Sequence, residues 1–164
     1  MNIVFFSIGT NLGDRDAHLK EALCKIEKNI GHIVKYSSVY ETEPWGFVSE
    51  NKFLNMVIKV ETRLDATGVM DEILKIESTL GRVRTGVKYF SRLIDVDILF
   101  YNDLILNDKD LIIPHPHMHE RKFVLVPMCE IEPGMIHPVL KKPMASLLEK
   151  CIDEGYVMKY DKSR

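Results

Sequence analysis

Apolar residues recur along the chain with two different periods, and these periods predict strands that alternate with helices. Residues 2–8, NIVFFSI, are mostly β-branched or aromatic and end at Gly9, which predicts a strand followed by a turn. Between residues 14 and 31 the apolar positions lie three and four residues apart, which predicts an amphipathic helix. Residues 33–41, IVKYSSVYE, then favour a second strand.

The following segments complete a recognisable order of elements. Residues 53–61, FLNMVIKVE, alternate in hydrophobicity and predict a half-buried strand. A second amphipathic helix is expected over residues 65–80, and residues 91–100, SRLIDVDILF, predict a mostly buried strand. Strand, helix, strand, strand, helix, strand is the split β-α-β arrangement of ferredoxin-like α+β folds, so we expect an antiparallel sheet with helices on one face.

The rest of the chain is expected to elaborate that core. Short strands are predicted around residues 104–107 and 111–114, a helical segment over residues 119–126, and a last helix over residues 144–151. Because 164 residues is a usual size for one domain, we expect a single domain over residues 1–164.

Composition and charge exclude several classes of protein. Hydrophobic residues make up 46% of the chain and charged residues 28%, which is typical of a globular protein. No apolar run approaches the roughly 20 residues of a membrane span, and the N-terminus has no basic leader, so we expect a cytoplasmic location and no membrane contact. The net charge of −2 argues against a surface dedicated to nucleic acid, and three widely spaced cysteines predict neither a disulfide framework nor a zinc site.

Two aspartates interrupt the apolar run of residues 91–100. Asp95 and Asp97 are two positions apart, so in a strand both side chains lie on the same face. A D-x-D pair considered alone most often faces solvent or pairs with arginines. Paired carboxylates on a rigid strand are also typical ligands of Mg²⁺, which takes its remaining ligands from water and substrate phosphates.

Cations precede the aspartates and change this balance. Arg82, Arg84, Lys88 and Arg92 occur with no acidic residue between the first and the last. Guanidinium groups bind phosphate oxygens and offset charge in phosphoryl transfer, although a basic loop is more often simply solvated. Basic residues beside a carboxylate pair favour a site for a polyphosphate with its magnesium.

Other segments suggest weaker possibilities. Phe53 and Asn55 lie on the less apolar face of their predicted strand, where a planar ring could stack on the phenyl group and bond to the amide, or where both residues could be structural. The run PHPHMHE favours a phosphate contact by one histidine over a metal site. The run GTNLGDR, residues 9–15, lacks the features of a P-loop and is expected to be a tight turn.

Four motifs together resemble one enzyme family: GRVR at residues 81–84, SRLIDVDILF at 91–100, FLN at 53–55 and GTNLGDR near the start. The family is 6-hydroxymethyl-7,8-dihydropterin pyrophosphokinase, of folate biosynthesis. The resemblance implies a ferredoxin-like core and transfer of pyrophosphate from ATP to the hydroxymethyl group of the dihydropterin, with AMP as the other product. It implies no obligate protein partner.

The resemblance also implies a role for each motif. Asp95 and Asp97 would bind two Mg²⁺ ions that bridge the ATP phosphates. The other residues implied to bind ATP are Arg82 and Arg92 at the β and γ phosphates, Arg84, His115 and Arg121 at further phosphate contacts, and Ile98 and Leu111 at the adenine. The residues implied to bind the pterin are Phe53 and Phe123 on its two faces, Asn55 and Thr42 at its edge, and Trp45 in a loop that closes over it.

Two alternatives remain at this point. A palm-type nucleotidyltransferase also places paired aspartates on a ferredoxin-like sheet, but it releases pyrophosphate. A regulatory ligand-binding module of the same fold would need no arginines beside the aspartates.

Overall fold

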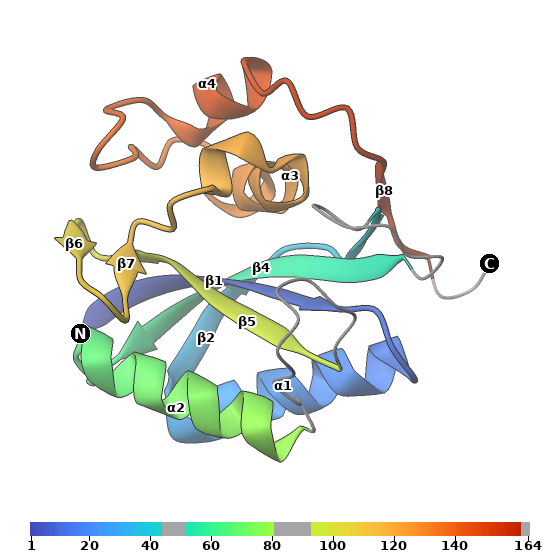
Figure 1. Ribbon diagram of the computed structural model, residues 1–164, viewed down its shortest axis with the longest axis vertical. Coiled ribbons are helices and arrows are strands. Elements are labelled where there is room, and N and C mark those ends of the chain that lie inside the picture. Colours follow the sequence, from blue (N-terminus) through green and yellow to red (C-terminus); the bar gives the residue numbers. More distant parts are fainter. Residues whose placement is uncertain (44–51, 81–92, 162–164) are drawn as a thin grey trace.

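A six-stranded antiparallel sheet forms the centre of the molecule, as the computed structural model shows for residues 1–43, 52–80 and 93–161 (Figure 1). The elements in chain order are β1 (Asn2–Thr10), α1 (Arg15–Asn29), β2 (Gly31–Tyr36), β3 (Tyr40–Thr42), β4 (Phe53–Thr62), α2 (Ala66–Thr79), β5 (Asp95–Tyr101), β6 (Leu106–Asn107), β7 (Ile112–Ile113), a 3₁₀ helix (Met118–Glu120), α3 (Lys122–Ile131), α4 (Met144–Glu149) and β8 (Val157–Lys159). This order confirms the predicted α+β class and the split β-α-β core.

The sheet has the order β5-β1-β4-β3-β8, and β2 pairs separately with β4. The central strands β1 and β4 are the longest, at 9 and 10 residues. The single strand predicted over residues 33–41 is instead two strands, β2 and β3. Ser37 separates them, because its hydroxyl accepts the Val57 amide hydrogen at 2.9 Å and so takes the place of a main-chain acceptor.

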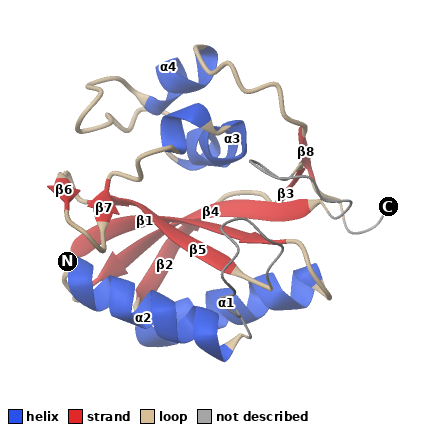
Figure 2. Ribbon diagram, in the orientation of Figure 1, coloured by secondary structure: helices blue, strands red, loops and turns tan. Residues whose placement is uncertain are grey.

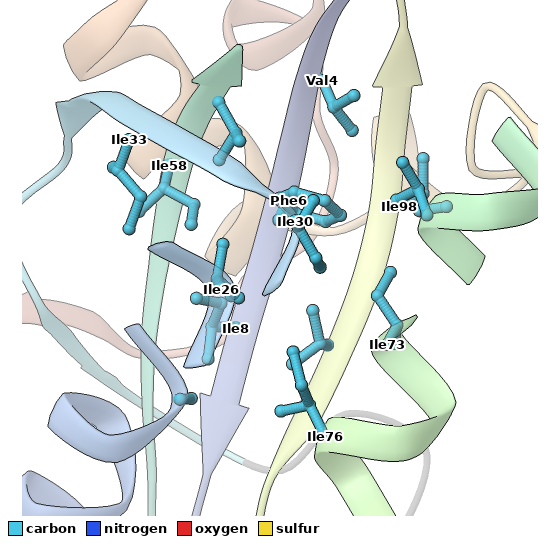
Figure 3. Packing of buried hydrophobic residues seen from close by; sticks show 14 of the residues in the cluster. Val4, Phe6, Ile8, Ile26, Ile30, Ile33, Ile58, Ile73, Ile76 and Ile98 are labelled. Atoms are coloured by element: carbon cyan, nitrogen blue, oxygen red, sulfur yellow. The ribbon is translucent and has the colours of Figure 1, made fainter. Parts of the chain in front are cut away.

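One face of the sheet is covered by α1 and α2, as expected (Figure 2). Asp14 and Asp65 cap the two helices, where their carboxylates accept hydrogen bonds from Ala17 and Gly68 amides. The apolar side chains beneath the helices form a continuous core, which includes Phe6 of β1, Ile58 of β4 and Ile73 of α2 (Figure 3). These three side chains are fully buried.

The opposite face is covered as well, which corrects the expectation of helices on one face only. In Figure 1, α3 and α4 lie across the sheet from α1 and α2. They complete a second core that includes Phe5 and Val57 from the sheet and Leu125 from α3. β4 is consequently buried on both faces along most of its length instead of being half-buried.

The C-terminal third differs in detail from its prediction. The expected helical segment over residues 119–126 is a 3₁₀ helix followed by α3, which extends to Ile131, and α4 ends at Glu149. β6 and β7 form the predicted pair of short strands. β8 was not predicted and pairs with β3. Within the described parts of the chain, no helix is both long and apolar enough to cross a membrane.

Candidate active site

Asp95 and Asp97 begin β5, where their side chains lie on the same face of the sheet. The register places Asp97 opposite Ser7 and Asp95 opposite Gly9 of β1, and Ser7 is opposite Val57 of β4. Val57 belongs to the core beneath α3, so both carboxylates are on the α3 face. Their neighbours across β1 are small, and both aspartates remain partly exposed while Ile94, Val96 and Ile98 are buried.

The same row of the sheet continues from Asp95 through Gly9 to Asn55 of β4. Asn55 is only 4% exposed, and its amide nitrogen donates a hydrogen bond to the Thr42 hydroxyl. Thr42 is in turn the register partner of Phe53. Three residues that the sequence predicts to bind the pterin are thus neighbours, and the row aligns them with the predicted metal ligand Asp95.

Gly9 is the position in this row where the Asn55 side chain lies against the backbone of β1. A Cβ atom at Gly9 would lie 2.5 Å from Asn55 Oδ1 and 3.6 Å from Phe53 Cδ1. The amide of Asn55 therefore occupies the space that any larger residue would need. The local sequence pattern predicts only a turn at Gly9, because the need for a glycine comes from Asn55 of β4, more than forty residues away in the chain.

A cavity of about 240 Å³ lies at the outer edge of β5. It is lined by Met70, Val96, Asp97, Ile98, Lys109, Asp110, Leu111, Ile112, His115 and Pro116. Four of the residues predicted on the ATP side are therefore in one cavity, which combines a carboxylate, aliphatic side chains and an imidazole. An apolar pocket with a few polar groups is the usual form of a small-molecule site.

The imidazole of His115 is neutral and can donate a hydrogen bond from Nε2. Burial, together with the nearby charges of Arg121 and His117, lowers its pKa from 6.5 to about 4, so the ring is neutral at neutral pH. Its Nδ1 accepts the His117 amide hydrogen at 3.1 Å. The proton of the neutral ring is consequently on Nε2, which can donate to a phosphate oxygen.

Arg121 and Phe123 are located at the start of α3. The Arg121 guanidinium lies over the Phe123 ring, with 5.8 Å between its Cζ and the ring centroid. Neither residue lines the cavity at β5, although the charge of Arg121 is close enough to lower the pKa of His115. Phe123 packs against the core beneath α3.

Four predicted site residues lie outside the described residues: Trp45, Arg82, Arg84 and Arg92. Their predicted roles stay predictions. Within the described ranges, no three His, Cys, Asp or Glu side chains gather into a metal centre. The carboxylate pair at β5 has the donor chemistry of a magnesium site that substrate phosphates and water complete.

Comparison with known proteins identifies the family. Residues 5–133 match the family described as 7,8-dihydro-6-hydroxymethylpterin-pyrophosphokinase (HPPK). The chain belongs to the HPPK family. A 2-amino-4-hydroxy-6-hydroxymethyldihydropteridine pyrophosphokinase of Aquifex aeolicus is 40% identical over 144 residues, which cover 88% of this HPPK chain and 89% of that protein. The protein of the same name from Bacillus subtilis is 38% identical over 131 residues, 79% of this chain and 78% of that one.

Longer proteins also contain a region similar to this HPPK chain. The folic acid synthesis protein fol1 of Pneumocystis carinii is 39% identical over 150 residues, which cover 92% of this chain and 20% of that protein. A crystal structure of an HPPK-DHPS in complex with substrates has a TM-score of 0.73 and 16% identity, over 90% of this chain and 43% of that chain. This structural likeness shows a shared fold, and the HPPK chain spans less than half of both longer proteins.

Proposed function

We propose that this chain transfers pyrophosphate from ATP to the hydroxymethyl group of 6-hydroxymethyl-7,8-dihydropterin, giving AMP and the pterin diphosphate for folate biosynthesis. Membership of the HPPK family supports this activity. The structural observation that carries it is the row Asp95, Gly9, Asn55 across three strands. It aligns a carboxylate suited to a metal-bound phosphate with an amide suited to the edge of a heterocycle.

In this proposal the two substrates occupy opposite ends of the row. ATP binds at the β5 cavity, with its adenine against Ile98 and Leu111 and its phosphates near His115 and Asp97. Arg121 adds a cation on the phosphate side. The pterin binds at the Asn55 end of the row, with its edge at Asn55 and Thr42 and its faces between Phe53 and Phe123. The location is assigned to the cytoplasm, and no protein partner is required.

Asp95 and Asp97 would bind two Mg²⁺ ions. Magnesium commonly takes one or two carboxylates and fills its other positions with water and substrate phosphates, which fits a pair of aspartates on one strand face. When bound, the metal supplies charge neutralisation at the phosphate oxygens. The chain's own contribution is to place the carboxylates rigidly on β5, between the ATP cavity and the pterin residues.

The chemical step itself needs little from side chains. The hydroxymethyl oxygen forms a bond to the β-phosphorus, the bond from that phosphorus to the α-β bridging oxygen breaks, and AMP leaves with the electron pair. The hydroxymethyl proton is lost to water or to a phosphate oxygen. Arg82 and Arg92 would offset the charge on the phosphate oxygens, and the chain mainly brings the two reactants together in line.

The first experiment identifies the nucleotide product. The protein is incubated with Mg-ATP, with and without 6-hydroxymethyl-7,8-dihydropterin. AMP that forms only with the pterin supports the proposal. ADP, or no product from folded protein, overturns it, and release of pyrophosphate would favour a nucleotidyltransferase.

The second experiment tests the carboxylate pair. Asp97→Asn keeps the size of the side chain but removes its charge, and we expect turnover to fall by about 10²–10³-fold, as when one transition-state stabilising group is lost. Asp71→Asn is the matched control, since Asp71 is exposed on α2. Equal turnover by the Asp97→Asn variant and the control would remove Asp97 from the site.

A further inference from the structure

Arg15, the last residue of the GTNLGDR run, connects two segments that lead into the pterin residues. Its Nη1 donates to the Lys52 carbonyl oxygen at 2.9 Å and to Glu41 Oε2 at 3.2 Å. Lys52 immediately precedes Phe53 in the chain, and Glu41 immediately precedes Thr42. A single guanidinium group therefore binds the residue before Phe53 and the residue before Thr42.

The guanidinium is itself held in place. The Tyr160 ring lies beside it, with 5.6 Å between Arg15 Cζ and the ring centroid. The Tyr160 hydroxyl donates to Asp16 Oδ2 at 3.0 Å, and the Tyr160 amide donates to the Val39 carbonyl at 2.8 Å. The Arg15 side chain is only 25% exposed. This support from Tyr160, which directly follows β8, reduces the freedom that a long side chain usually has.

The location matters because β3 and β4 share a short ladder. Three residue pairs make it up, and Thr42 with Phe53 is the terminal pair. The ends of a short ladder open more easily than its centre. Arg15 bonds next to this terminal pair on both strands, so it opposes that opening.

We propose that Arg15 is a positioning residue for the pterin subsite. By joining Glu41 to Lys52, it keeps Thr42 and Phe53 at the distance that the Asn55 amide and a planar ring require. Arg15 does not touch the substrate in this scheme. The inference rests on the proposed function, because it assigns the ring-binding role to these residues.

The test is steady-state kinetics with each substrate varied separately. The wild-type protein is compared with Arg15→Ala, Arg15→Lys and Arg63→Ala. Arg63 is an exposed arginine just beyond the other end of β4, which makes it a matched control. Thermal unfolding of each variant shows whether it is folded at the assay temperature.

We expect Arg15→Ala to raise the KM for the pterin about tenfold, the effect of losing roughly one charge-assisted hydrogen bond, while the KM for ATP and kcat change less than about twofold. Arg15→Lys retains a donor near Glu41 and should recover part of the loss. Arg63→Ala should match the wild type.

Three outcomes would overturn the inference. An unchanged pterin KM in folded Arg15→Ala would refute it and leave the proposed function intact. Equal rises in both KM values would show a general structural role instead of a specific one. Absence of AMP from the wild-type protein would refute the proposed function and the positioning role together.

Discussion

Gly9→Ala is the smallest change that tests the row across the sheet. The added Cβ would lie 2.5 Å from Asn55 Oδ1, whereas a relaxed C···O contact is roughly 3.3–3.6 Å. The amide must therefore move by about 1 Å. Phe53 Cδ1 at 3.6 Å from the same point blocks one direction of movement, and the hydrogen bond to Thr42 opposes another.

The cost of this change falls on stability and on binding. Asn55 is 4% exposed, so it has little free space, and overpacking of a buried site costs about 1–3 kcal/mol. Displacing the amide would also remove the hydrogen bond that we propose it makes to the pterin ring, and such a bond is worth about 0.5–1.5 kcal/mol. We therefore expect the KM for the pterin to rise by up to about tenfold, because about 1.4 kcal/mol corresponds to a factor of ten.

Gly134→Ala is the matched control. A Cβ at Gly134 would meet no heavy atom within 4 Å. This variant should therefore have the unfolding free energy and the turnover rate of the wild type. The assays are denaturant unfolding and the pterin KM at saturating ATP. If Gly9→Ala retained both the wild-type stability and the wild-type pterin KM, the amide of Asn55 would not be fixed over Gly9, and the argument for the row would fail.

Two further predictions concern the ATP side of the site. Thr10→Val removes the hydroxyl that donates to the Leu93 carbonyl, two residues before Asp95, so we expect kcat to fall by roughly 2–10-fold while the pterin KM stays constant; an equal effect on both would contradict this division. His115 has its pKa lowered from 6.5 to about 4, so its neutral form stabilises the fold fully above pH 6.5 and this contribution is lost as the pH falls toward 4. The unfolding free energy of His115→Asn should consequently fall less steeply than that of the wild type between pH 7 and 4, by up to about 3 kcal/mol, and parallel curves would contradict the low pKa.

The spacing of apolar residues predicts an element well when that element buries only one face, against a single neighbouring layer. The three- and four-residue spacing between residues 14 and 31 corresponds to α1, whose Leu19, Ala22 and Ile26 are buried against the sheet. The terminal aspartates that cap α1 and α2 act within four residues, so they too are visible in the sequence. These two helices are among the elements that were predicted correctly.

Elements that depend on distant partners were missed. β8 has three residues, of which Val157 is partly buried and the other two are exposed, so no hydrophobic period marks it; its position comes from pairing with β3. The split between β2 and β3 depends on the bond from the Val57 amide to Ser37. Val57 is buried because α3 covers its face of the sheet. The alternation of residues in β4 does not show whether another element covers that face.

In the candidate site, too, some residues stand out in the local sequence and others depend on distant partners. Asp95 and Asp97 drew attention because two charges in an apolar strand are costly without a purpose, and the basic residues before them favoured a polyphosphate site. Phe53 received its predicted role only from the family resemblance. Gly9 and Arg15 gave no comparable signal. Their importance comes from contacts with Asn55, Glu41 and Lys52, and each contact joins segments far apart in the sequence.

Hydrophobic alternation and the site geometry are linked through the register of β1. Val4, Phe6 and Ile8 face the core beneath α1 and α2, which leaves Ser7 and Gly9 on the face of the carboxylates. A shift of one residue would place these apolar side chains on the wrong face, so the core strongly disfavours it. The burial that stabilises the sheet therefore also fixes Asp95 and Asn55 on either side of Gly9. In this molecule the alignment of the two predicted substrate subsites is a direct consequence of core packing, and no separate element is needed to produce it.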